Sequence, residues 1–418
     1  MNKKYLIIIY LLTNFLFTQK ILIPMDESQN DHLKAYGLAF FILNNNETVD
    51  WLLNFKGGSF LIDNNNYITQ ECILRGITYQ EISVSQLINI YEVIEKNNMD
   101  IILLEKAPKI AVYSPPDKQP WDDAVTLVLE YAEIDYDIIF DDEVINNELS
   151  KYDWLHLHHE DFTGQYGKFY KNYKNKGWYK KMEFDFNNTA NRLGFGSVHI
   201  LKKTIAQKIK NYINNGGFLF AMCSATDSFD IALAAHNVDI APSAFDRTPI
   251  DRNYYSKLNF SNSIAFEHYT LYTDPNVYEY STIDFPPSHK PNTRSAEADF
   301  FVLFEFSAKW DPVPTMLTQN HTAIINGFMG QTTGFNKDYL KNHVLIMGED
   351  PGSNQTKYIH GNIGKGTFTF LGGHDPEDYT HKVGDPVTDL SLHPNSPGYR
   401  LILNNVLFPA ARKKDKKT

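Results

Sequence analysis

The order of apolar and polar residues predicts alternating strands and helices from residue 20 onwards. Between residues 20 and 105 we expect strands at 20–25, 49–55, 59–62 and 99–104, and helices at 31–43 and 84–96. Asp31 is placed to cap the first helix, and the Gly57-Gly58 pair separates the second and third strands. Residues 20–105 are therefore predicted to form an amino-terminal α/β unit, either as a small domain or as an extension of a larger sheet.

A second series of strands and helices follows. Apolar runs predict strands at 109–113, 136–140, 153–159, 218–222, 343–347 and 367–371. Helical spacing predicts helices at 121–134, 199–214, 228–235 and 399–407. This alternation is typical of a parallel sheet with helices on both faces. Residues 238–340 interrupt it with Pro, Asn and aromatic residues, so we interpret them as an insertion that caps the sheet of a domain spanning 106–418.

The amino terminus has the pattern of a secretory signal. A short basic stretch, Met1–Lys4, precedes the apolar run Tyr5–Phe17. That run is shorter than the roughly 20 residues that a transmembrane helix needs. A buried first strand is the alternative, but residues 20–24 supply a better one. We therefore predict a signal peptide at 1–19, a periplasmic or secreted protein, and no stable membrane span.

Composition narrows the classes of partner. The chain has 418 residues, with 39 Lys and Arg against 50 Asp and Glu, a net charge of −11. This acidic balance argues against nucleic acid as a partner. Two cysteines, Cys72 and Cys223, cannot form a disulfide scaffold or a cysteine-only zinc site. They can form one disulfide, or leave one of them as a reactive thiol.

Cys223 has the sequence context of a nucleophile. The apolar strand 218–222 leads into a turn with Cys223 at its apex, and a helix is expected to follow. A sharp strand-to-helix turn exposes a nucleophile, and a helix amino terminus lowers the pKa of a thiol. Ala221 and Ala225 are small enough for a tight turn. A buried structural cysteine, or a disulfide with Cys72, is the alternative interpretation.

His374 is the candidate base for this thiol. It follows the predicted strand 367–371 and the pair Gly372-Gly373, with Asp375 and Glu377 close behind. A nucleophilic cysteine needs a base, and the base needs an orienting acceptor, which Asp375 or Glu377 could provide. A loop histidine that caps a turn is the alternative.

A third polar segment follows the predicted strand 153–159. His156 and His158 share one face of this strand, and His158, His159, Glu160 and Asp161 stand where it should end. These groups could position a substrate, or could bind a metal through imidazole and carboxylate ligands. The helical spacing HExxH is absent, so we assign the four residues to substrate binding and predict no metal or cofactor.

Two further residues are expected at the same edge of the sheet. Ser224 follows the candidate nucleophile, and its backbone N–H could help to hold an oxyanion. Asp117 follows the strand 109–113 and could add a carboxylate, although it could equally serve only to form the turn Ser114–Asp117. Both are assigned to substrate binding.

Residues 109–235 and 343–411 together resemble the class I glutamine amidotransferase-like superfamily, which includes the DJ-1/PfpI proteins. That family has a cysteine in a [GA]-x-C-x-G turn, and Ala221–Ala225 is similar, with alanine as the last residue. Its histidine follows a later strand, as His374 does. The end of the chain also resembles the trehalose-utilisation-type branch. The resemblance implies a flavodoxin-like parallel sheet and a nucleophile–base pair of Cys223 and His374.

The whole chain also resembles a family of bacterial proteins often labelled asparagine synthetase B. The resemblance rests on Ile23–Asp26, His32–Gly37 and Leu155–Gly167. The activity in that label is not expected. A glutamine-dependent synthetase resembles a fusion that needs a cysteine at the mature amino terminus and an S-G-G-x-D-S phosphate loop. No cysteine precedes Cys72, and the loop is absent.

Three functions are compatible with these patterns. The first is an exported hydrolase or amidase-like enzyme with Cys223 as nucleophile and His374 as base, acting on an amide, peptide or related acyl compound. The second is a protein of the same fold that binds a carbohydrate or peptide without catalysis. The third is a metal-assisted hydrolase built from His158, His159, Glu160 and His374. In each case the partner is a small molecule, a peptide or a carbohydrate.

Overall fold

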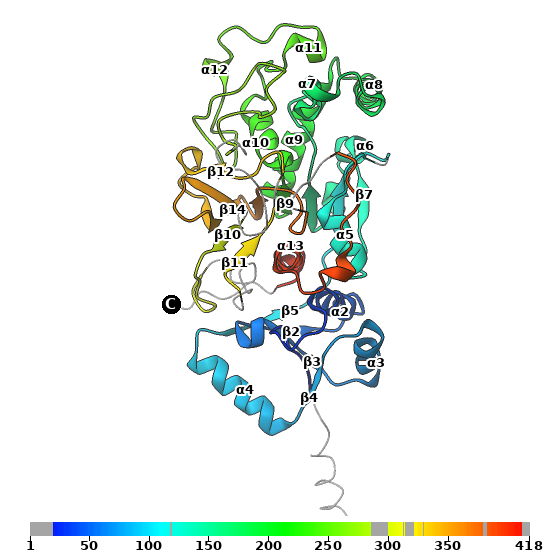
Figure 1. Cartoon of the computed structure of the whole chain (residues 1–418), viewed down its shortest axis with the longest axis vertical. Helices are drawn as coiled ribbons and strands as arrows, with labels where there is room; N and C mark the ends of the chain where they lie inside the picture. The colour runs from blue at the N-terminus through cyan, green and yellow to red at the C-terminus, as the bar shows by residue number, and fades with distance from the viewer. Residues whose placement is uncertain are drawn as a thin grey trace, which may run out of the picture.

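The computed structural model of the chain describes residues 20–117, 119–285, 300–311, 313, 322–328, 330–378 and 383–411. The predicted signal peptide, 1–19, lies outside the described residues, as does part of the predicted insertion. The described chain forms two sheets with helices packed on them (Figure 1).

The amino-terminal sheet has five strands in the order β4-β1-β3-β2-β5, and all neighbouring pairs are antiparallel. Its strands are β1 (Lys20–Ile23), β2 (Val49–Leu53), β3 (Ser59–Asp63), β4 (Gln80–Ile82) and β5 (Asp100–Leu104). Its helices are α2 (His32–Asn44), α3 (Asn66–Arg75) and α4 (Val84–Lys96). Asp31 caps α2, as predicted, by accepting a hydrogen bond from the backbone N–H of Lys34. The sequence analysis missed α3 and β4.

The larger sheet has ten strands, and its path runs β11-β10-β13-β14-β15-β9-β8-β6-β7. Five strands are mutually parallel: β6 (Ile110–Tyr113), β7 (Asp137–Ile139), β8 (Trp154–Leu157), β9 (Phe218–Met222) and β15 (Gly366–Leu371). The others are antiparallel to their neighbours: β10 (Phe300–Leu303), β11 (Ile324–Asn326), β12 (Phe335–Asn336), β13 (Leu345–Glu349) and β14 (Gln355–Ile363). The sheet is therefore mixed, which corrects the expectation of a wholly parallel one.

The antiparallel half follows from a tight hairpin. Ile363 pairs with Gly366, so only Gly364 and Lys365 join β14 to β15. A parallel pair would need a crossover of a dozen or more residues. Gly361 and Asn362 still belong to β14, so the glycines at 361 and 366 lie in the paired strands and not in the turn.

Helices cover both faces of the parallel strands. On one face, Val112 and Phe220 pack with α5 (Ala124–Tyr131) and α13 (Pro397–Leu407). On the other, Ala111 and Leu219 pack with α9 (Val198–Asn214) and α10 (Ser224–Ala234). Successive residues of one strand thus point into different cores, as strand geometry requires. The shorter or outer helices are α6 (Asp141–Ile145), α7 (Tyr170–Tyr173), α8 (Gly177–Arg192), α11 (Ser243–Asp246) and α12 (Tyr254–Lys257).

Helices α2 and α13 join the two sheets (Figure 1). The Tyr36 hydroxyl lies 2.5 Å from the Asn404 side-chain oxygen. The guanidinium of Arg400 is buried and donates to the carbonyls of Met25 and Gly57. The amino-terminal unit therefore supports the face of the large sheet on which α5 lies. Within the described chain, no helix has the length and apolar character needed to cross a bilayer.

Candidate functional site

Four parallel strands end side by side at one edge of the large sheet. The residue after the last strand position is Ser114 for β6, His158 for β8, Cys223 for β9 and Gly372 for β15. Carboxyl ends of parallel strands are where ligand sites of open α/β sheets form. The three polar segments that the sequence predicts at this edge therefore emerge from neighbouring strands.

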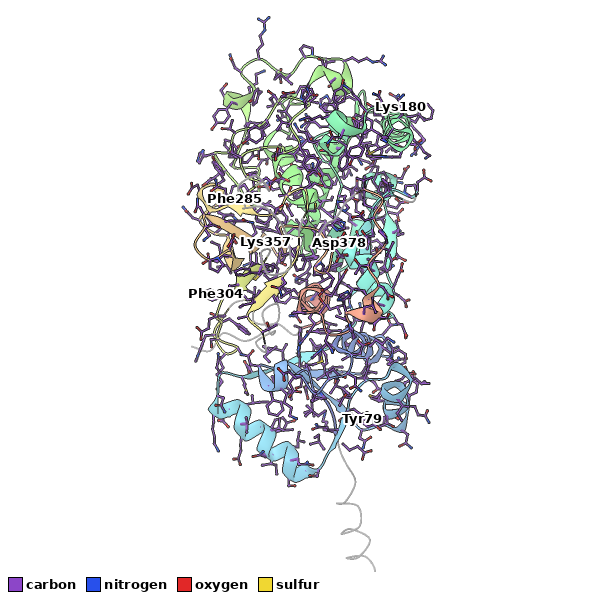
Figure 2. All side chains as sticks on the ribbon, in the orientation of Figure 1. Tyr79, Lys180, Phe285, Phe304, Lys357 and Asp378 are labelled. Carbon is purple, nitrogen blue, oxygen red and sulfur yellow. The ribbon has the colours of Figure 1, made fainter. Side chains whose placement is uncertain are left out.

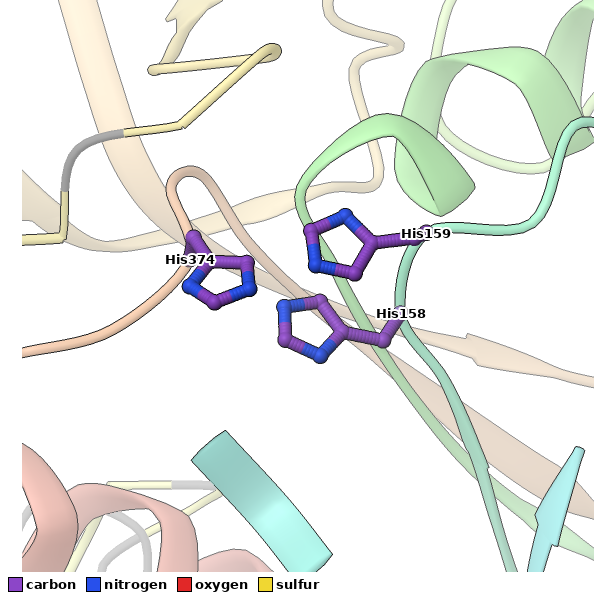
Figure 3. Close-up of side chains that lie close together, drawn as sticks. All are labelled: His158, His159 and His374. Atoms are coloured by element: carbon purple, nitrogen blue, oxygen red, sulfur yellow. The ribbon is translucent and has the colours of Figure 1, made fainter. Parts of the chain in front are cut away.

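Three imidazole rings meet there (Figure 3). The ring centroids of His158 and His159 are 3.9 Å apart, and each lies 4.3 Å from the centroid of His374. One nitrogen of each ring lies within 4.8 Å of the corresponding atoms of the other two. Two of the histidines follow β8, and the third follows β15, so the cluster depends on the fold and not on local spacing. His158 and His374 are buried, whereas His159 is half-buried.

Two successive aspartates orient the cluster. The Nδ1 atom of His158 lies 3.1 Å from a carboxylate oxygen of Asp123. The Nε2 atom of His374 lies 3.0 Å from the backbone carbonyl oxygen of Asp122. Both oxygens are acceptors, so each facing nitrogen is the one that carries the ring proton. The lone pairs of His158 and His374 are consequently at Nε2 and Nδ1, respectively.

Asp123 is held firmly in place. Its side chain caps α5 by accepting hydrogen bonds from the backbone N–H groups of Val125 and Thr126. It also contacts Nε2 of His156 at 3.2 Å. Burial raises the pKa of this carboxyl, but His156 and His158 outweigh that effect and bring the pKa well below its usual range. Asp123 is therefore an ionised carboxylate that fixes two imidazoles.

Glu160 and Asp161 play different parts. Glu160 accepts a hydrogen bond of 2.8 Å from the backbone N–H of His158, and burial raises the pKa of its carboxyl to about 7. Asp161 accepts hydrogen bonds from the backbone N–H groups of Thr163, Gln165 and Gly167. Asp161 is therefore a loop-forming residue, and both carboxyl groups belong to the lining of the cleft beside the histidines.

Cys223 occupies a strained turn, as the sequence suggests. Its φ of 51° and ψ of −136° are unusual for a residue with a side chain. The side chain is fully buried, and Sγ accepts a hydrogen bond of 3.3 Å from the backbone N–H of Gln331. Burial is the largest influence and raises the pKa of this thiol to about 11. Cys72 lies on α3, and both cysteines are free, so the disulfide alternative does not apply.

Residues 327–328 and 330–334 cover the thiol. A side chain at Gly330 would approach Sγ of Cys223 to 3.0 Å, and one at Gly373 would lie 1.6 Å from the Phe328 carbonyl oxygen. Lys357, labelled in Figure 2, is buried and donates to that carbonyl and to the carbonyl of Gly327. The cover is therefore fixed from both sides, and Cys223 is shielded from solvent.

The remaining predicted residues have other partners. Asp375 accepts hydrogen bonds from the hydroxyls of Tyr399 at 2.8 Å and Thr388 at 3.1 Å. Burial raises the pKa of this carboxyl to about 6. Glu377 contacts His393 at 3.4 Å. Ser224 is buried at the first position of α10. Asp117 is exposed and pairs with Lys181 of α8.

Two clefts adjoin the histidines. One, of about 530 Å³, is lined by His158, His159, Glu160 and Asp117 among others. The other, of about 540 Å³, is lined by Gln331 and by the aromatic residues Tyr173 and Tyr278, and the buried Cys223 borders it without any exposed surface. Trp121, His159 and Phe169 line both. His159 is thus the histidine with access to both clefts.

The sequence analysis missed the groups that orient the histidines. It extended the helix of α5 back to Trp121, which placed Asp122 and Asp123 inside it, whereas the helix begins at Ala124. An aspartate immediately before an apolar helical run is a capping pattern that could have located Asp123. The contact of His374 with the backbone carbonyl of Asp122 could not be predicted, because every residue has such a carbonyl.

Comparisons with known proteins do not indicate a function for this chain. No family profile and no curated protein matches the chain. Two solved structures of cytoplasmic proteins, from Salmonella typhimurium and its strain LT2, each align over 73% of this chain and 100% of their own, at 11% identity and TM-scores of 0.35 and 0.36. A β-galactosidase from Bacillus circulans sp. alkalophilus aligns over 66% of this chain and 29% of its own, at 10% identity and a TM-score of 0.27. Structural similarity with such low TM-scores supports no conclusion about function.

Proposed function

We propose that this protein is a hydrolase that cleaves an amide, peptide or related acyl bond at the three-histidine cluster. The observation that carries the proposal is the meeting of His158, His159 and His374 beside a cleft of about 530 Å³. Hydrolysis joins a water oxygen to the acyl carbon, and the water proton leaves with the amine or alcohol. Imidazoles can activate that water by taking its proton or by holding a metal ion.

Cys223 is the nucleophile of a second candidate mechanism. Its positive φ at a strand-to-helix turn favours this role, because nucleophiles of several hydrolases stand on such strained turns. Its burial and its raised pKa of about 11 weigh against it, since only the thiolate attacks an acyl carbon. A substrate would also have to displace the cover that Gly330 and Gln331 form. The histidine-centred mechanism requires no such rearrangement.

The order of the parallel strands supports a relationship to the class I glutamine amidotransferase-like superfamily. Numbered along the chain, the five parallel strands run 2-1-3-4-5, which is the flavodoxin-like order. We propose that the antiparallel strands are additions to such a core, and that the segment around Tyr278 and Gln331 caps its clefts. Export of the protein is a further part of the proposal, and it rests on the apolar run at 5–17.

Hydrolysis of a panel of acyl substrates by two variants tests the proposal. The panel contains activated esters, N-acetylated amines and short peptides. His159→Ala should lower kcat/KM at least about 100-fold, whereas Cys223→Ser should stay within about threefold of the unaltered protein. The opposite pattern would favour the cysteine mechanism. Saturable binding of a glycan or peptide without turnover would instead support a binding protein, for which the aromatic lining of the second cleft is suited.

A further inference from the structure

We infer that His158, His159 and His374 bind one divalent transition-metal ion, and that zinc is the ion which suits them best. Three imidazoles with an open fourth position are a familiar ligand set of catalytic zinc. A tetrahedral ion with zinc–nitrogen bonds of about 2.0–2.1 Å places its ligand nitrogens roughly 3.3 Å apart. The three nitrogens lie within 4.8 Å of one another, so side-chain rotations that bring them closer complete the site.

A hydrogen-bond acceptor faces one ring nitrogen in two of the three histidines. Nδ1 of His158 faces the Asp123 carboxylate, and Nε2 of His374 faces the Asp122 carbonyl. Metal-binding histidines almost always donate their other N–H to a carboxylate or a backbone carbonyl. Both types of partner are present here, on consecutive residues. Nε2 of His158 thus turns its lone pair toward the other two rings. In His374 the nitrogen nearer those rings is Nε2 (Figure 3), so this ring must rotate to offer its Nδ1 lone pair to the ion.

Charge also favours a cation at this place. Three protonated imidazoles with centroids 3.9–4.3 Å apart would repel one another. Three neutral imidazoles that hold a single cation avoid this repulsion. The neighbouring carboxylate of Asp123 provides negative charge outside the ligand set, as it does in carboxylate–histidine–metal arrangements.

The ion would retain a position open to substrate. His158 and His159 line the first cleft, and His159 also lines the second. A water on the ion would therefore face solvent-accessible space, where the ion lowers the pKa of that water to about 7. Among the described residues, no group of possible ligands includes Cys223, so the site takes imidazole and water ligands without thiolate.

A second group of possible ligands serves as a control. His199, Asp239 and Asp246 also lie within reach of one ion. Asp239 and Asp246 already accept hydrogen bonds from Thr248, however, and the ammonium group of Lys203 lies close enough to influence His199. Their surroundings thus disfavour a cation.

Metal titration of the full-length protein, after treatment with a chelator, tests the inference without any substrate. Zn²⁺ should bind with a stoichiometry of one ion per chain. His159→Ala and His374→Gln should each weaken binding at least about 100-fold, and His199→Ala should leave it unchanged. Circular dichroism spectra that match the unaltered protein would exclude misfolding. Because binding is measured alone, its failure is distinct from a failure of the proposed hydrolase.

The unaltered protein supplies an independent measurement. Co²⁺ in place of Zn²⁺ should give the visible absorption of a tetrahedral site with nitrogen and oxygen ligands, and no thiolate charge-transfer band. The inference is overturned by less than one bound ion per chain at millimolar Zn²⁺. It is equally overturned if binding is lost in His199→Ala and kept in His374→Gln, or if the Co²⁺ spectrum contains a thiolate band.

Discussion

Asp227 illustrates at the scale of single residues how burial controls charge near the site. It is fully buried on α10, accepts a hydrogen bond from the hydroxyl of Thr332, and has a carboxyl whose pKa burial raises to about 7. Because the folded-state pKa exceeds the unfolded one, the stability that protonation provides is complete below about pH 4 and is lost as the pH rises through 7.

Asp227→Asn should remove this dependence. The amide oxygen can accept the same hydrogen bonds without the cost of a buried charge. We expect the variant to be more stable than the unaltered protein by roughly 2–4 kcal/mol at pH 8, and equally stable at pH 4. Urea denaturation at both pH values measures the difference. A variant that is destabilised equally at both would show that Asp227 carries no such charge.

Cys223 should be an unreactive thiol. In a Cys72→Ser background, alkylation of Cys223 by iodoacetamide should be roughly 300-fold slower than that of a free thiol near pH 7, because its pKa is raised to about 11. The rate should increase about tenfold per pH unit up to that value. Rapid alkylation with an apparent pKa below about 8.5 would contradict this and favour the cysteine mechanism.

The sequence predicts the candidate catalytic and metal-binding residues better than it predicts the groups that contact them. His158, His159, Cys223 and His374 are all found at strand ends, because each follows a clear apolar run. The groups that orient them could not be found in the same way. His374 meets a backbone carbonyl rather than Asp375, and a carbonyl is present at every position of a chain. Only the fold selects which one is used.

At the scale of elements, the amino terminus of α5 fixes the orientation of the histidine rings. Asp123 both caps the helix and contacts His158, and these two roles can be separated. Asp123→Asn keeps a capping oxygen but loses the charge, so stability should change by less than about 1 kcal/mol while Zn²⁺ affinity falls 10–100-fold. Asp123→Ala should also lose about 1 kcal/mol of stability.

Ser197→Ala provides the matched control for this comparison. Ser197 caps α9, so the variant should lose about 1 kcal/mol of stability without any change in Zn²⁺ affinity. Thermal denaturation and metal titration measure the two quantities. Equal affinity in Asp123→Asn and the unaltered protein would show that the carboxylate does not orient His158.

Strand prediction succeeded for the apolar parallel strands and failed for β14, in which polar residues are buried. β6, β8, β9 and β15 follow apolar runs, and their predicted positions agree with the structure to within about two residues. β14 contains Gln355, Lys357 and His360, all fully or almost fully buried. Two of these side chains have partners that the strand's own sequence does not reveal, the Phe328 carbonyl for Lys357 and the Thr369 hydroxyl for His360. A pattern of hydrophobicity therefore could not predict this strand, nor the antiparallel half of the sheet that depends on it.

At the scale of the whole molecule, the two sheets should unfold together. Arg400 of α13 donates to two carbonyls of the amino-terminal unit, and α2 packs against both α5 and α13. Arg400→Ala leaves these buried carbonyls without their donor and should cost roughly 3 kcal/mol. Fluorescence and circular dichroism should still report one common urea transition. Two separate transitions in the unaltered protein would show that the sheets are independent.

We propose above that His158, His159 and His374 form the reaction centre and hold a metal ion. Anomalous X-ray diffraction at the zinc absorption edge, from crystals grown with one equivalent of Zn²⁺ per chain, tests it most directly. We predict a single strong anomalous peak about 2.0–2.1 Å from one nitrogen of each of these three rings. The absence of such a peak at the cluster, or a peak at His199 in its place, would contradict the account.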